Sequence, residues 1–250
     1  PLSFEEYNDL KLQHNNVRDL IKKGYFIGRD LIQIPVVFHN LYKIVDDIPI
    51  NSYCDFIGYN NYTTGNDQNS CNEMVLRTLE IINSQYANVE IEFVLHPDYP
   101  EMLHATDIGF DGFLENATGN NFPTSDELKE HYNIPNAINI YTADCLGTGL
   151  TEACNSSVYG YSSSAWGANE PGIFIKHNAM PGSEINWAYT NLLTLAHELG
   201  HYFSLLHTQG YWFKTTPSIR TPRELVSGED CENRGDLICD TPGSAGADNS

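Results

Sequence analysis

The stretch from His197 to His207 constrains this chain most, because it places three histidines at fixed offsets. His197 and His201 are four residues apart, about one helical turn, so they share one face of an α-helix. Both imidazoles can then bind one zinc ion at about 2.0–2.1 Å. His207, six residues beyond His201, adds a third ligand and leaves the fourth position of a tetrahedral ion to water. The stretch therefore predicts a helix that carries an open zinc site.

The residues around these histidines indicate how the helix packs. An apolar stripe at helical spacing comprises Ala188, Leu192, Leu195, Leu199 and Phe203. At about 100° per residue the two histidines fall nearly opposite this stripe, so the helix can bury one side and present them on the other. The alternative interpretation is a surface helix with two solvated histidines. Glu198, directly after His197, is placed to accept a proton from a water at the metal, as a general base does.

The order of these residues resembles a known signature. Residues 197–207 resemble the pattern HExxHxxGxxH of the metzincin zinc proteases at every specified position except the glycine. Residues 195–208 resemble the pappalysin (cytophagalysin) family of metzincins, and residues 34–39 and 235–242 match other stretches of that family. The resemblance covers most of the chain, from about residue 30 to residue 248.

This resemblance implies a secreted zinc metalloendopeptidase, a hydrolase that cleaves peptide bonds in protein or peptide substrates. It assigns Zn²⁺ to His197, His201 and His207 and the role of general base to Glu198. The substrate and the cleavage site stay open.

The chain departs from the family pattern at two points. Ser204 stands where the signature has a glycine that leaves the helix in a left-handed conformation, and serine there costs about 1 kcal/mol. Metzincins also carry a methionine turn downstream of the third histidine. Met74, Met102 and Met180 all precede His197, so we expect the chain to stop before that turn, with a short, incomplete C-terminal lobe.

A calcium site is a further implication of the resemblance. Asp236 and Asp240 lie in a loop that follows the predicted zinc helix, where the family resemblance implies Ca²⁺. Carboxylates and backbone carbonyls are the hard oxygen ligands that suit this ion. The alternative is that both side chains are solvated or cap local turns.

Two other functions stay open. In a gluzincin-type protease the third zinc ligand is a downstream glutamate such as Glu224, although the offset of His207 argues against it. A non-catalytic secreted binding protein could keep zinc for structure, although it has no use for a general base at Glu198.

The charge of the chain limits its partners. It has 250 residues, with 33 acidic and 13 basic side chains and a net charge of −20. A surface this acidic repels nucleic acid and anionic membranes. No apolar run approaches the ~20 residues of a membrane-spanning helix. We expect peptide partners, no nucleic acid and no membrane span; the oligomeric state is open.

Six cysteines indicate the compartment. They form three local pairs, Cys54 with Cys71, Cys145 with Cys154, and Cys231 with Cys239. An even number without zinc-finger spacing is typical of disulfides in an extracellular protein. Pairing between neighbours is the hypothesis, and reduced buried cysteines are the alternative. Localisation is predicted as secreted.

The rest of the chain predicts an α/β (α+β) fold. Strands are expected at residues 31–42, 89–95, 137–142, 159–165 and 172–175, the fourth of them an edge strand. Helices are expected from residue 70 to about 86, at 125–131, and from 183 or 190 to 204. This alternation implies a mixed sheet backed by helices, and the metzincin resemblance makes it twisted and mostly parallel. Residues 1–28 are predicted as an N-terminal helical arm or pro-segment remnant, and residues 29–250 as one catalytic domain.

Overall fold

The computed structural model describes residues 31–41, 43–45, 48–50, 68–105, 125–143, 146, 158–163, 171–180 and 191–207. Residues Asp30–Phe203 form one compact unit, and the sheet and helices below belong to it. The predicted N-terminal arm lies outside the described residues, and the predicted domain boundaries stay a prediction.

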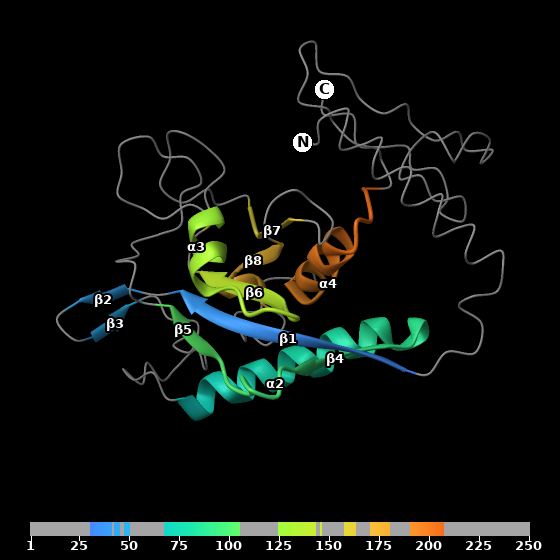
Figure 1. The fold of residues 1–250 in the computed structure, drawn as a ribbon, viewed down its shortest axis with the longest axis horizontal. Helices are drawn as coiled ribbons and strands as arrows, with labels where there is room; N and C mark the ends of the chain where they lie inside the picture. Colours follow the sequence, from blue (N-terminus) through green and yellow to red (C-terminus); the bar gives the residue numbers. More distant parts are fainter. Residues whose placement is uncertain are drawn as a thin grey trace, which may run out of the picture. The chain divides into compact units, whose positions relative to one another are not determined.

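A six-stranded, mostly parallel sheet forms the centre of this unit (Figure 1). Its strands are β1 (Ile32–Leu41), β4 (Ile91–Leu95), β5 (Leu103–Ala105), β6 (Ile138–Ala143), β7 (Gly160–Ser163) and β8 (Gly172–Lys176). The order is β4-β1-β6-β8-β7, and β5 also pairs with β1. All strand pairs are parallel except β7 with β8, which is antiparallel. Strand β7 is the last in this order and therefore forms an edge of the sheet.

The strands form where apolar and β-branched residues run together. All six residues of β6 and all five of β8 are buried, as expected for strands covered on both faces.

A second, two-stranded sheet pairs β2 (Lys43–Val45) with β3 (Ile48–Ile50) in antiparallel register.

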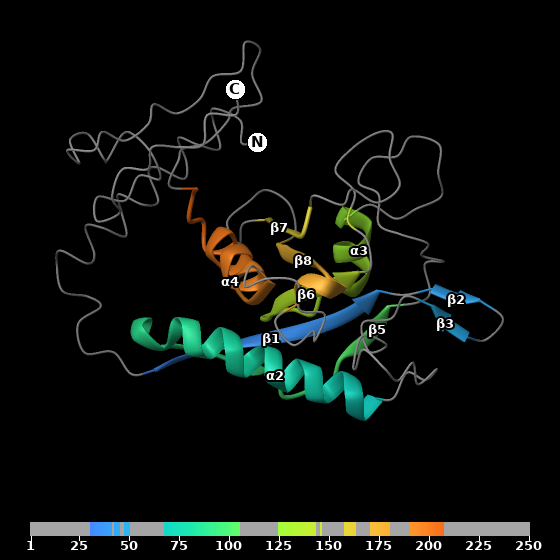
Figure 2. The ribbon, with the colours of Figure 1, turned by 180° about the vertical axis from the view of Figure 1, so that it is seen from behind.

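Helices cover both faces of the sheet. They are α2 (Gln68–Tyr86), α3 (Ser125–Tyr132) and α4 (Asn191–Tyr202), with short 3-10 turns η2 (Ala87–Val89) and η3 (His177–Ala179). Figures 1 and 2 show α3 and α4 on either side of β6 and β8, and α2 alongside β4 and β1.

Alternation along each strand divides the core into two clusters. One cluster unites the apolar faces of α2 and α4 with alternate residues of the central strands, which include Val36, Phe38, Ile140 and Ile175. The other packs Leu128 of α3 against residues of the opposite strand face, Leu41, Tyr141 and Phe174. The sheet is therefore a middle layer, which confirms the predicted fold class.

The predicted elements agree with the structure to within a few residues. Helix α2 begins two residues before Ser70, and its apolar stripe of Val75, Leu79, Ile82 and Tyr86 packs in the core. The edge strand is shorter than predicted, and β2, β3 and β5 were not predicted. None of the described helices is long and apolar enough to cross a membrane.

Candidate metal centre

Helix α4 is fixed by its apolar stripe. Leu195 and Leu199 have no exposed surface, and the ring of Phe203 stacks on Phe93 of β4 with centroids 6.4 Å apart. On the α2 side, the Tyr86 hydroxyl donates a hydrogen bond to the Ala196 carbonyl oxygen at 3.0 Å. These contacts hold the turn that carries the two predicted zinc ligands.

The structure brings all three predicted histidines together. The Nε2 atoms of His197 and His201 are 3.0 Å apart, and their rings stand nearly perpendicular, at 82°. Two ligands of a tetrahedral ion at 2.0–2.1 Å would lie about 3.3 Å apart. One ligand nitrogen from each of His197, His201 and His207 lies within 4.8 Å of the other two.

This donor set fits zinc. Within the part of the chain that the structure describes, it is the one group of three or more His, Cys, Asp or Glu side chains close enough to share an ion. Partial burial, and secondarily the nearby His201, lower the pKa of His197 below its ordinary value. The neutral imidazole, which is the form that binds a metal, is therefore favoured at neutral pH.

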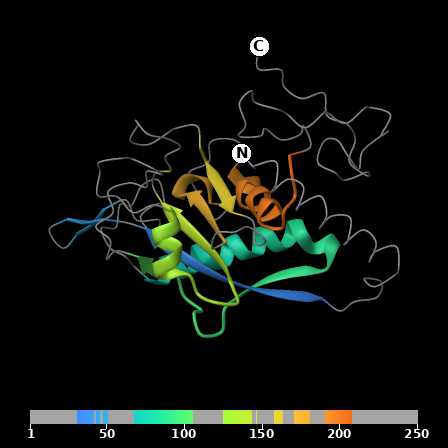
Figure 3. The same cartoon turned by 45° about the horizontal axis from the view of Figure 1, so that its top comes forward.

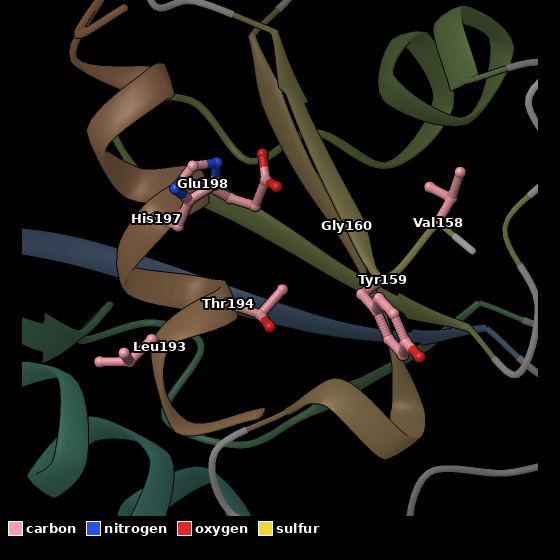
Figure 4. Close-up of a pocket in the computed structure, with 7 residues that line it drawn as sticks. All are labelled: Val158, Tyr159, Gly160, Leu193, Thr194, His197 and Glu198. Carbon is pink, nitrogen blue, oxygen red and sulfur yellow. The ribbon is translucent and has the colours of Figure 1, made fainter. Parts of the chain in front are cut away.

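Glu198 lies in a different environment from the histidine beside it. Only 6% of its surface is exposed, and loss of hydration raises the pKa of its carboxyl to about 7. Figure 4 shows its side chain extending from α4 toward β7, whereas His197 stands beside it on the same helix. A buried carboxyl of this kind is suited to exchange a proton with a group in the adjacent cleft.

An open cleft of about 440 Å³ adjoins this pair (Figure 4). Strand β7 and the residues before it supply one side, and α4 supplies the other. The lining residues are Val158, Tyr159, Gly160, Leu193, Thr194, His197 and Glu198. Figure 3 shows β7 beside α4. The cleft is large enough for one or two amino-acid side chains and opens directly at Glu198.

The chain leaves α4 through a left-handed residue. Ser204 has φ of 69°, two residues after the helix ends at Tyr202. This is the conformation that the glycine of the signature would supply, so the chain follows the expected path despite the serine.

Several predicted sites cannot be compared with the structure. Glu224, Asp236 and Asp240 lie outside the described residues, and so do five of the six cysteines. Cys71 is fully buried and disulfide-bonded, and its partner also lies outside them. The predicted pairings and the calcium site therefore stay predictions.

The family resemblance implied that the edge strand borders the substrate cleft, but sequence reasoning did not find which of its residues line the cleft. It predicted an edge strand there but assigned no role to Tyr159 or Gly160, which line the cleft. A glycine inside a predicted strand is the available signal, because it often marks a close approach of the backbone.

Comparison with known proteins adds little to this geometry. No family model matches the chain, and no curated protein matches it. A solved structure of a promirolysin mutant from Tannerella forsythia is similar, with 18% identity and a TM-score of 0.44. The match covers 80% of this chain and 65% of the length of that one.

Proposed function

We propose that this protein is a zinc-dependent endopeptidase. The observation that carries the proposal is the convergence of three histidine nitrogens within 4.8 Å, next to a carboxylate that is 6% exposed. His197, His201 and His207 would hold the ion. Bound zinc would polarise the scissile carbonyl and activate a water.

The chain's own residues then divide the remaining work. Glu198 takes the proton of the attacking water and returns it to the leaving amine. Its burial raises the pKa of its carboxyl to about 7, which suits a group that both accepts and donates a proton. The cleft bordered by Tyr159 and Leu193 receives substrate beside Glu198. An acidic side chain in this position favours a hydrolase over a protein in which zinc is only structural.

Replacement of Glu198 tests the proposal. Glu198→Gln should retain zinc and the fold but lose about 10²-fold to 10⁴-fold in turnover, because the amide cannot accept the proton. Glu80→Gln, on an exposed position of α2, is the matched control and should behave as wild type. Turnover is measured on a peptide library and zinc by metal analysis. Wild-type activity in Glu198→Gln would refute the assignment of the base.

Membership of the pappalysin family and secretion are part of the same proposal. The signature residues 197–207 and the six cysteines support it. Peptide mapping under non-reducing conditions would test the three neighbour pairings, and a bridge from Cys145 to Cys231 would contradict them.

Calcium binding at Asp236 and Asp240 is also proposed, since carboxylate oxygens suit this ion and would relieve repulsion among nearby acids. Calcium should raise the melting temperature by several degrees, and Asp240→Ala should abolish the rise. Magnesium is the control ion. Equal melting temperatures with calcium and with a calcium chelator would exclude the site.

A further inference from the structure

Strand β7 contacts α4, and Gly160 of β7 lies against the side chain of Glu198. Gly160 pairs with Ile175 of β8 and also lines the cleft beside Glu198. A Cβ atom at this position would lie 3.0 Å from Cγ of Glu198, 2.7 Å from Cδ1 of Ile175 and 3.2 Å from the carbonyl oxygen of Phe174.

These distances leave no room for a methyl group. Non-bonded carbon atoms are most stable about 3.5–4.0 Å apart, so each of the two carbon contacts is too short. The backbone at Gly160 is outside the left-handed region, and any residue could adopt its conformation. The requirement for glycine is therefore one of space, and the space is occupied by Cδ1 of Ile175 and by the stem of Glu198.

We propose that Gly160 is a positioning residue for Glu198. Because residue 160 lacks a side chain, the stem of Glu198 lies against the backbone of β7, and this contact sets where its carboxylate stands relative to His197. The inference rests on the proposed function, in which Glu198 is the base. A side chain at residue 160 displaces the stem, and a misplacement of about 1 Å in a catalytic group can cost about 10²-fold in rate.

Gly160→Ala tests this proposal, and Gly172→Ala is its matched control. Gly172 starts the neighbouring strand, and the atoms nearest to a Cβ there are Cδ and Cγ of Lys129, at 3.1 and 3.3 Å, rather than atoms of Glu198. Gly160→Ala should lower kcat about ten-fold or more, change KM little and leave zinc content unchanged. Gly172→Ala should retain wild-type kcat. An unchanged kcat in Gly160→Ala would overturn the proposal.

A second substitution separates the Glu198 contact from general packing. Ile175→Val removes Cδ1, the atom closest to the added methyl group, but leaves Glu198 untouched. In Gly160→Ala with Ile175→Val the melting temperature should recover relative to Gly160→Ala, whereas kcat should stay low. Recovery of kcat to the level of Ile175→Val alone would show that Gly160 acts only through strand packing, and would overturn the proposal.

Crystal structures of wild type and Gly160→Ala test the proposal without an activity measurement. Displacement of the Glu198 side chain in the variant supports the proposal, and an unmoved side chain refutes it. If wild-type protein with bound zinc hydrolyses no peptide, the proposed function fails, and the crystal structures still decide whether Gly160 positions Glu198.

Discussion

Neighbouring residues of α4 have opposite environments. His197 is the most exposed of the three histidines, whereas Glu198 is only 6% exposed. Successive helical residues point about 100° apart, so one turn can offer a ligand to the solvent side and a carboxyl to the β7 side. Adjacent positions of a regular helix can thus supply both an accessible candidate metal ligand and a buried carboxyl.

The third ligand can be identified by a pair of single substitutions. His207→Ala should lower zinc affinity at least ten-fold, because its nitrogen lies within 4.8 Å of the other two histidine nitrogens. Glu224→Gln should leave zinc affinity unchanged. Zinc affinity is measured by competition with a chelator. The reverse pattern would support the gluzincin-type site in place of the one proposed.

Some residues of the site could be predicted from the sequence, and others could not. His197 and His201 share one face of α4 through helical spacing, whereas His207 lies beyond the end of the helix and was predicted from its offset in the signature. Gly160 lies 38 residues before Glu198 in the chain, and its proximity depends on how β7 pairs with β8. Spacing within a helix says nothing about such a contact, which is why the sequence did not reveal it.

At the scale of single elements, the end of α4 combines a serine with a conformation that favours glycine. Ser204 is buried and has φ of 69°. A residue with a Cβ loses about 1–2 kcal/mol in this region, whereas glycine loses about 0.5–1 kcal/mol of conformational entropy on folding.

Ser204→Gly should therefore raise the free energy of unfolding by about 0.5–1 kcal/mol. Ser204→Ala keeps the strained conformation and should give no gain. Urea denaturation measures both. A glycine variant no more stable than wild type would mean that interactions of the serine side chain offset the strain.

The elements themselves were predictable where they are long or fully buried. The apolar runs of β1, β6 and β8 and the stripe of α2 gave boundaries within about three residues of those observed. Strands β2, β3 and β5 have three residues each, too few to establish a period of two. The order of the strands also depends on long-range packing that no local pattern encodes.

For the whole molecule, two buried histidines predict sensitivity to acid. Burial lowers the pKa of His39 to about 4 and that of His177 to about 3, despite opposing hydrogen bonds to Asn139 and to the backbone of Thr142. Both pKa values lie below the ordinary histidine value of 6.5. Between pH 6.5 and these lowered values, the unfolded chain therefore binds more protons than the folded chain. Their contribution to stability is complete above about pH 6.5 and is lost as the pH falls toward 4 and 3. Each histidine contributes a slope of up to about 1.4 kcal/mol per pH unit.

His39→Phe should reduce this slope between pH 6.5 and 4. The new ring can keep the stacking on Tyr141, now at 4.4 Å between centroids, and Asn139 Oδ1 still accepts a hydrogen bond from the Ile134 amide. The free energy of unfolding is measured by urea denaturation at each pH. Equal slopes in variant and wild type would contradict the assignment to His39.

The central position of β1 has a consequence for biosynthesis. The strand leaves the ribosome before all its partners, and its buried His39 pairs with Asn139, which is 100 residues later in the chain. At about 5–20 residues per second, that partner follows about 5–20 s later. During this time β4 and β5 become available to one edge of β1, the edge that pairs with β6 stays open, and the residues of the candidate metal centre have not been synthesised. The three candidate metal ligands are therefore synthesised only after every described strand of the sheet.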